Sequence, residues 1–105
     1  MISFRRYEIV LPTRYNDGSP VEDEKLDLVI QELSEEFGGL SFYPEHLRGV
    51  WIHEGQTFAE ANVRIAVDAE DTSKTADFFT RYKELLKERF HQIDLWIVSY
   101  QIRVT

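Results

Sequence analysis

The chain of 105 residues contains no cysteine. This absence excludes disulfides, thiolate zinc sites and a cysteine nucleophile, and it fits a reducing cytoplasm. No apolar run approaches the roughly 18 residues that span a membrane. The two arginines Arg5 and Arg6 are not followed by the apolar core of a signal peptide. We therefore expect a cytoplasmic protein that makes no membrane contact.

Basic residues are also scarce, with 12 Lys and Arg against 19 Asp and Glu, and the formal net charge is −7. Nucleic acids and anionic membranes need cationic side chains to neutralise them, so we expect neither as a partner. The acidity itself favours solubility. At this length the sequence predicts a single domain over residues 1–105.

Motifs for common cofactors are missing as well. His46, His53 and His91 fall on separate predicted elements, without the helical spacing that joins two imidazoles on one metal ion. The serines lack the context of a nucleophile elbow. The pair Gly38-Gly39 follows a predicted helix, whereas a phosphate-binding loop opens one. We expect no cofactor and no metal.

A predicted β-hairpin is the most informative feature that is present. Its strands are Gly49 to Glu54 and Thr57 to Val67, joined by a turn at Gly55-Gln56 with glycine first. This register sets Trp51 opposite Glu60 and His53 opposite Phe58. It also collects the apolar residues on one face: Val50, Ile52, Ala59, Ala61, Val63, Ile65 and Val67.

Helices and further strands are predicted on both sides of the hairpin. Alternation predicts a strand from Phe4 to Pro12. Ser19-Pro20 is expected to open a first helix, which Gly38-Gly39 ends. A connection over residues 40–48 leads into the hairpin. A second helix, with N-cap candidates at residues 71–73, precedes a last strand from Asp94 to Val104.

This order predicts an α+β fold, the ferredoxin-like βαββαβ two-layer sandwich. An antiparallel four-stranded sheet carries both helices on one face. The first and third strands are expected to be central, and the second and fourth to form the edges. The other face of the sheet is then left open.

The open face combines charged and aromatic side chains, whereas a merely solvated face should be polar. Strand parity assigns nine residues to it: Arg6, Glu8, Val10, Trp51, His53, Phe58, Glu60, Asn62 and Arg64. Within this set His53 is the candidate for proton transfer, with Glu60 or Glu8 as a second acid or base. Arg64 or Arg6 is the candidate for holding a carboxylate or phosphate.

Each candidate also has a purely structural interpretation. Glu8 and Arg64 are suited to a cross-strand ion pair on the two central strands. His53 is suited to stacking on Phe58, and Trp51 to packing at a dimer seam. The sequence leaves these alternatives open.

The last strand is apolar on both faces, because Leu95 and Ile97 alternate with Trp96 and Val98. An edge strand of this kind needs a cover. We expect a second copy of the chain to provide it, since small oligomers are commonly two-fold homodimers. The alternative is that the connection over residues 40–48 folds across it.

Known families with this fold differ at the diagnostic positions. An RNA-recognition domain needs stacking aromatics where Glu8 and Arg64 stand. The pattern of Phe37-Gly38-Gly39, Gly49-Val50-Trp51 and Gly55 resembles one found in small bacterial proteins of unknown function, and that resemblance implies no activity. The sequence thus predicts a homodimeric ligand- or protein-binding module, with a small anionic ligand or a partner protein. The alternative hypothesis is a small-molecule enzyme that uses the open-face cluster.

Overall fold

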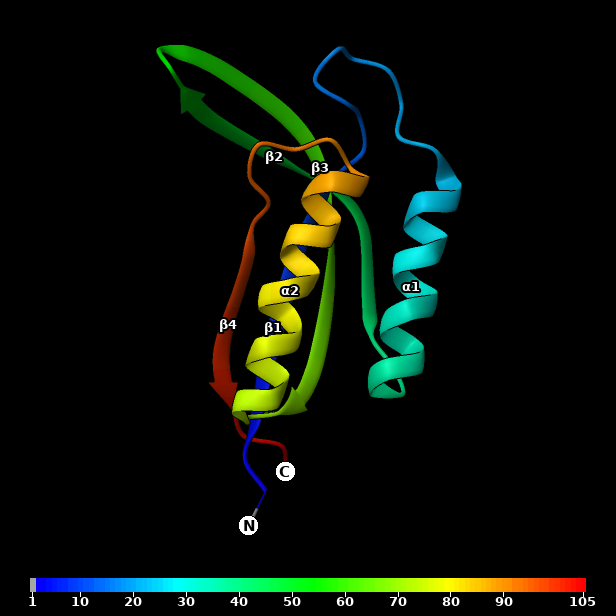
Figure 1. Ribbon diagram of the computed structural model, residues 1–105, viewed down its shortest axis with the longest axis vertical. Helices are drawn as coiled ribbons and strands as arrows, with labels where there is room; N and C mark the ends of the chain where they lie inside the picture. The colour runs from blue at the N-terminus through cyan, green and yellow to red at the C-terminus, as the bar shows by residue number, and fades with distance from the viewer. Residues whose placement is uncertain (1) are drawn as a thin grey trace.

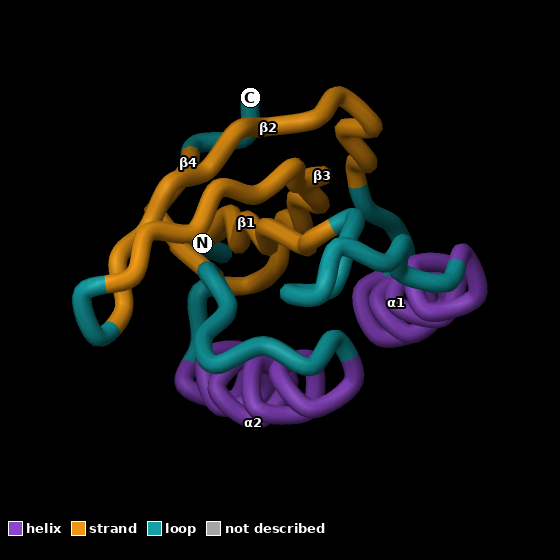
Figure 2. The backbone as a smooth tube through the Cα atoms, turned by 90° about the horizontal axis from the view of Figure 1, so that it is seen from above, coloured by secondary structure: helices purple, strands orange, loops and turns teal. Residues whose placement is uncertain are grey.

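The computed structural model describes residues 2–105, and their side chains except those of residues 45–49, 51 and 58–60. Six elements follow one another along the chain: β1 (Phe4–Pro12), α1 (Asp23–Phe37), β2 (Ser41–His53), β3 (Gln56–Glu70), α2 (Ser73–Arg89) and β4 (Ile97–Ile102). Both helices lie on the same side of the sheet (Figures 1 and 2). The predicted ferredoxin-like α+β fold is therefore confirmed.

The sheet has the strand order β2-β3-β1-β4, and every neighbouring pair is antiparallel. As predicted, β1 and β3 are central and β2 and β4 are the edges. In the β1–β3 register Ile9 lies opposite Ile65, and Val10 lies opposite Arg64. Because side chains alternate along a strand, this register separates a helix-facing set from an open-face set.

The core lies between the sheet and the helices. Strands β1 and β3 fill it with residues of one parity, including Ile9 and Ile65, and both side chains are completely buried. From the helices, Val29 and Leu33 of α1 and Phe79 and Leu86 of α2 reach into the same cluster: the buried members are Tyr7, Ile9, Leu11, Val29, Leu33, Val63, Ile65, Val67, Ala69, Phe79, Tyr82, Leu86, Phe90 and Leu95. The apolar faces predicted for β1 and for the part of β3 from Val63 to Val67 thus lie in the core.

Helix α1 begins later than Ser19-Pro20, which is a correction to the sequence prediction. The Asp17 carboxylate accepts a hydrogen bond from the Ser19 backbone N–H at 2.8 Å, and Pro20 forms an isolated bridge with Arg14. This local turn takes the place of a first helical turn, because Asp side chains readily bond the backbone two residues on. The helix ends as predicted, with Gly38 in the left-handed conformation at φ 81°.

The expected connection over residues 40–48 is instead the first half of β2, which is a second correction. Ser41, Phe42 and Tyr43 pair with β3, and an irregularity between Tyr43 and Leu47 interrupts the ladder. Proline lacks an N–H to donate, so Pro44 falls naturally within this irregularity. Since β2 and β4 are opposite edges of the sheet, this segment does not cover the last strand.

The hairpin turn consists of Glu54 and Gly55, one residue earlier than predicted. Both have positive φ, at 51° and 76°, as a type I′ turn requires. Consequently Trp51 pairs with Phe58 and His53 with Gln56. Each partner is displaced by two residues from the prediction, so the division of side chains between the two faces is preserved.

The β2–β3 hairpin extends beyond the helices, and we call residues 48–61 the arm (Figure 1). Strand lengths explain this projection. The 15 residues of β3 span about 45 Å. The 17 residues of α2 span only about 26 Å. Val50 and Ile52 share the parity of the core, yet they are 70% and 71% exposed because no helix reaches them.

No helix among the described residues is long and apolar enough to cross a membrane.

Candidate open-face site

Three residues meet on the open face, two of them predicted from the sequence. Glu8 of β1 and Arg64 of β3 are diagonal neighbours, with 4.0 Å between Glu8 Oε1 and Arg64 Nη1. The Tyr100 hydroxyl of β4 donates a hydrogen bond of 3.0 Å to the same Glu8 oxygen. The predicted cross-strand contact thus exists, but at a separation that leaves Arg64 loosely held.

Arg64 has an aromatic ring beside its guanidinium and a buried Nε atom, which is an unusual combination for an arginine at the surface. Its guanidinium carbon lies 4.4 Å from the centre of the Tyr43 ring, a cation–π arrangement. Its Nε atom is buried and has no hydrogen-bond partner among the described residues. A buried donor without a partner is costly, so this position favours an added acceptor.

Arg6, the other predicted anion-binding residue, is already occupied. Its Nε and Nη2 atoms donate to the two carboxylate oxygens of Asp68 at 2.7 and 3.0 Å. Asp68 lies directly opposite Arg6 in the β1–β3 register. This paired arrangement lowers the pKa of Asp68 through the Arg6 hydrogen bonds and leaves Arg64 as the better candidate for a ligand.

His53 does not join this cluster. It pairs with Gln56 at the tip of the arm, whereas Arg64 pairs with Tyr43 at the far end of β2. The eight-residue step from Gln56 to Arg64 along β3 corresponds to about 26 Å of strand. Within one chain, His53 and Arg64 are therefore too far apart to act on the same small molecule.

The other predicted site residues are distributed as follows. Trp51, Phe58 and Glu60 lie on the arm, and their side chains fall outside the described residues. Asn62 is only 5% exposed, at the base of the arm, and it is the buried polar residue of the described core. The open-face residues predicted from the sequence are thus not brought together as a single site among the described side chains.

Apolar side chains remain uncovered around the site. Trp96, which precedes β4, is 65% exposed, and Tyr100 of β4 is 42% exposed. Strand β4 itself, Ile97 to Ile102, carries no charged residue and no proline. Edge strands usually carry such residues to prevent pairing with other chains. The last strand is shorter than the predicted Asp94 to Val104, and Trp96 lies just before it.

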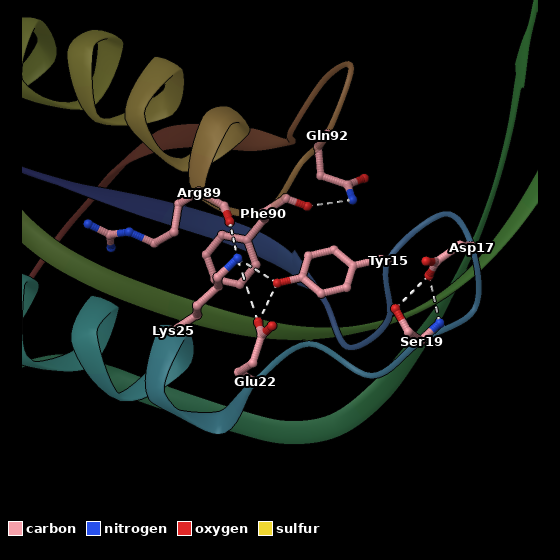
Figure 3. Close-up of polar contacts among 8 residues, drawn as sticks. All are labelled: Tyr15, Asp17, Ser19, Glu22, Lys25, Arg89, Phe90 and Gln92. Atoms are coloured by element: carbon pink, nitrogen blue, oxygen red, sulfur yellow. Dashed lines mark hydrogen bonds and ion pairs between the residues drawn. The ribbon is translucent and has the colours of Figure 1, made fainter.

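A polar cluster that the sequence reasoning missed joins the two helices (Figure 3). Lys25 Nζ donates to the Tyr15 hydroxyl at 2.5 Å and to the Arg89 carbonyl oxygen at 2.7 Å. The Tyr15 hydroxyl also donates to the Glu22 carboxylate. The hydrogen bond from Tyr15 lowers the pKa of Glu22. These contacts fasten the β1–α1 loop to the end of α2.

An ion pair between the two helices is a second interaction that the sequence reasoning missed. The Arg89 guanidinium makes a two-point contact with the Glu32 carboxylate, and the Tyr82 hydroxyl donates to Glu32 at 2.9 Å. The hydrogen bond from Arg89 lowers the pKa of Glu32 despite partial burial. A local sequence pattern could not predict this ion pair, because Glu32 and Arg89 are 57 residues apart.

Among the described side chains, no cluster of His, Asp or Glu suits a metal ion.

Comparison with known proteins identifies the fold. No protein-family model and no curated protein matches the chain. Among solved structures, it is similar to the divalent cation tolerance protein CutA1 of Thermus thermophilus, with 16% identity and a TM-score of 0.65. That alignment covers 97% of this chain and 86% of the other.

Two further solved structures have the same fold. A phage SAM lyase in complex with S-methyl-5′-thioadenosine is 20% identical, with a TM-score of 0.62, over 97% of this chain and 90% of that chain. The GlnK–ATP complex of B. subtilis is 17% identical, with a TM-score of 0.54, over 95% and 82%. At these identities the similarity concerns the fold alone.

Proposed function

We propose that the protein is a homodimeric binding module in which a second copy of the chain covers the arm and the exposed apolar residues beside β4. The observation that carries this proposal is the exposure of Val50 and Ile52, at 70% and 71% on a projecting hairpin. By strand parity Trp51 lies on the opposite face of the same strand. The sequence thus places large apolar residues on both faces of the arm.

A two-stranded ribbon without a covered apolar face is marginally stable in water. None of the chain's described elements covers Val50 or Ile52, since the helices end below the arm (Figure 1). A second copy offers the matching surface, because the same uncovered groups are present on both partners and a two-fold interface is self-complementary. The exposed Trp96 has the amphipathic bulk that is enriched at protein interfaces.

The test is a matched pair of polar variants analysed by sedimentation velocity. In the double variant Val50→Thr, Ile52→Thr we expect the dissociation constant of the dimer to rise at least tenfold. Each substitution replaces an apolar side chain with one that carries a hydroxyl, so less apolar surface is buried on association. The control is Leu85→Thr, which makes a similar change at a 43% exposed position on α2. Equal association by wild type and double variant would argue against the arm as the interface.

A second candidate function, a small-molecule enzyme or anion-binding site at the open face, is favoured by Arg64 alone. Its contact with Glu8 is long, at 4.0 Å, so its Nη1 atom suits an incoming carboxylate or phosphate. Glu8 and Tyr100 supply a carboxylate and a hydroxyl beside it. Because His53 lies at the arm tip, the geometry does not support it as the acid or base of this cluster in the same chain.

Calorimetry with ATP and with uncharged S-methyl-5′-thioadenosine, the ligands in two of the similar structures, tests this candidate. An anion site predicts that ATP binds more tightly, and that Arg64→Gln weakens it about tenfold. Arg81→Gln, on the exposed face of α2, is the control. If Arg64→Gln bound ATP as tightly as the wild type, the proposed anion site at Arg64 would be wrong.

Cytoplasmic location and kinship with small bacterial proteins remain predictions from the sequence.

A further inference from the structure

A groove of about 540 Å³ runs along α2 on the helix side of the sheet, where residues of β1 and β4 form its other wall. It faces away from the open-face site, because its β1 residues, Arg5 and Tyr7, have the opposite parity to Glu8. This volume is within the range of small-molecule sites. No function described above uses it.

The floor of the groove is apolar and already assembled. The rings of Tyr7 and Phe79 stack with their centroids 4.0 Å apart and an interplanar angle of 11°. Both side chains are almost fully buried, and Ile97 extends the apolar surface toward the β4 edge. A flat hydrophobic or aromatic group is the complement of such a floor.

Tyr7 brings a hydroxyl to the lining of the groove. The residue as a whole is only 5% exposed. Burial raises the pKa of this phenol, so it stays a neutral donor at physiological pH. An acceptor that enters the groove can take a hydrogen bond from this hydroxyl.

Cations line the groove at both of its ends. Arg5 gives one N–H to Asp71 at 3.0 Å and one to Ser99 at 3.2 Å, which leaves three of its five donors for other acceptors. Lys83 lines the far part of the groove and contacts Asp94 at 3.2 Å. Ser73 and Lys83 are ten residues apart on α2, a distance of about 15 Å.

We propose that this groove binds an elongated organic anion, with its charged group at Arg5 and its apolar body over Tyr7 and Phe79. A carboxylate, sulfonate or phosphate would satisfy the free Arg5 donors together with the Tyr7 hydroxyl. In a chain of net charge −7, this lining carries two cations against the single carboxylate of Asp71. The proposal does not depend on the dimer, because the groove is lined by residues of a single chain and none of them lies in the arm.

Amide NMR of the isotope-labelled protein, titrated with anilinonaphthalene sulfonate, tests the proposal. This probe joins a sulfonate to an aromatic body, and N-phenylnaphthylamine is its uncharged counterpart. We expect the largest shifts at groove residues such as Ser73, Thr80 and Ser99. Shifts confined to Trp96 and the arm would show adsorption to the exposed apolar surface and overturn the proposal.

Variants then separate charge from shape. Arg5→Gln should raise the dissociation constant of the sulfonate about tenfold and leave that of the neutral amine unchanged. Lys74→Gln, a cation outside the lining, should change neither. Ala76→Leu narrows the groove at an exposed helix position and should weaken both probes, which keeps the test decisive if Arg5→Gln folds poorly. Equal affinities in wild type and Ala76→Leu would contradict the proposal.

Discussion

Arg6 and Asp68 face each other across the two central strands and are joined by two hydrogen bonds of 2.7 and 3.0 Å. Both side chains are more than one-third exposed, at 37% and 40%. Solvent screening therefore keeps their contribution small, although the geometry is favourable. The pair occupies the Arg6 donors, so Arg64, whose contact with Glu8 is 4.0 Å long, is the better anion-binding candidate of these two arginines.

Asp68→Asn is expected to lower the free energy of unfolding by only about 0.5 kcal/mol at pH 7. The pKa of Asp68 is depressed in the folded state, so its contribution is present above the unfolded pKa and is lost as the pH falls through the folded pKa. Urea unfolding at pH 7 and at strongly acidic pH measures both effects. The variant Asp77→Asn on α2 is the control. A difference between wild type and Asp68→Asn that persists unchanged in acid would contradict this account.

Glu32→Gln is expected to cost more, about 1–3 kcal/mol, because Arg89 is only 15% exposed and would lose its charged partner. The pKa of Glu32 is also depressed, chiefly by Arg89, so the stabilisation again exists above the unfolded pKa and disappears in acid. Chemical denaturation across this pH range tests it, with exposed Glu36→Gln as the matched substitution. A loss no larger than that of Glu36→Gln would show that the interhelical pair contributes little.

Leu86→Ala and Leu85→Ala form a matched pair of adjacent substitutions on α2. Leu86 is fully buried, whereas Leu85 is 43% exposed. We expect losses of about 2–5 kcal/mol for Leu86→Ala and below about 1 kcal/mol for Leu85→Ala. Thermal or urea unfolding of the two variants measures the contrast. Similar losses at both positions would mean that Leu85 is covered in solution, for example by a partner.

Gly55→Ala tests the turn of the arm. Gly55 has φ 76°, and no atom lies within 4 Å of the position that a Cβ would take, so the cost comes from the backbone alone. We expect a loss of about 1 kcal/mol. Gly39→Ala is the control, because Gly39 has equal space around it without a positive φ. Denaturant unfolding that finds both variants equally stable would disprove the left-handed turn.

The sequence predicted the parts of the fold that rest on regular alternation. Strand β1 was bounded correctly, because its apolar residues occur at every second position. The sequence does not predict Tyr43 as a site residue. Pro44 and the irregularity that follows it interrupt the alternation by which the strand could be recognised. The groove could not be predicted, because Arg5, Thr80 and Ser99 come together only through tertiary packing.

The arm shows another limit of pattern reasoning. Alternation assigned Val50 and Ile52 to the helix-facing side, and their parity is correct. Periodicity carries no information on where the covering helices end, and here they end before these residues. Exposure of a core-like pattern is therefore visible only in the structure, and it is the basis of the proposed dimer.

Light scattering of the wild-type protein after size exclusion, at micromolar concentration, tests the central proposal most directly. A homodimer predicts a molar mass twice the 12.4 kDa of one chain. The double variant Val50→Thr, Ile52→Thr should move toward the mass of one chain under the same conditions. A wild-type protein that elutes with the mass of a single chain would contradict the account.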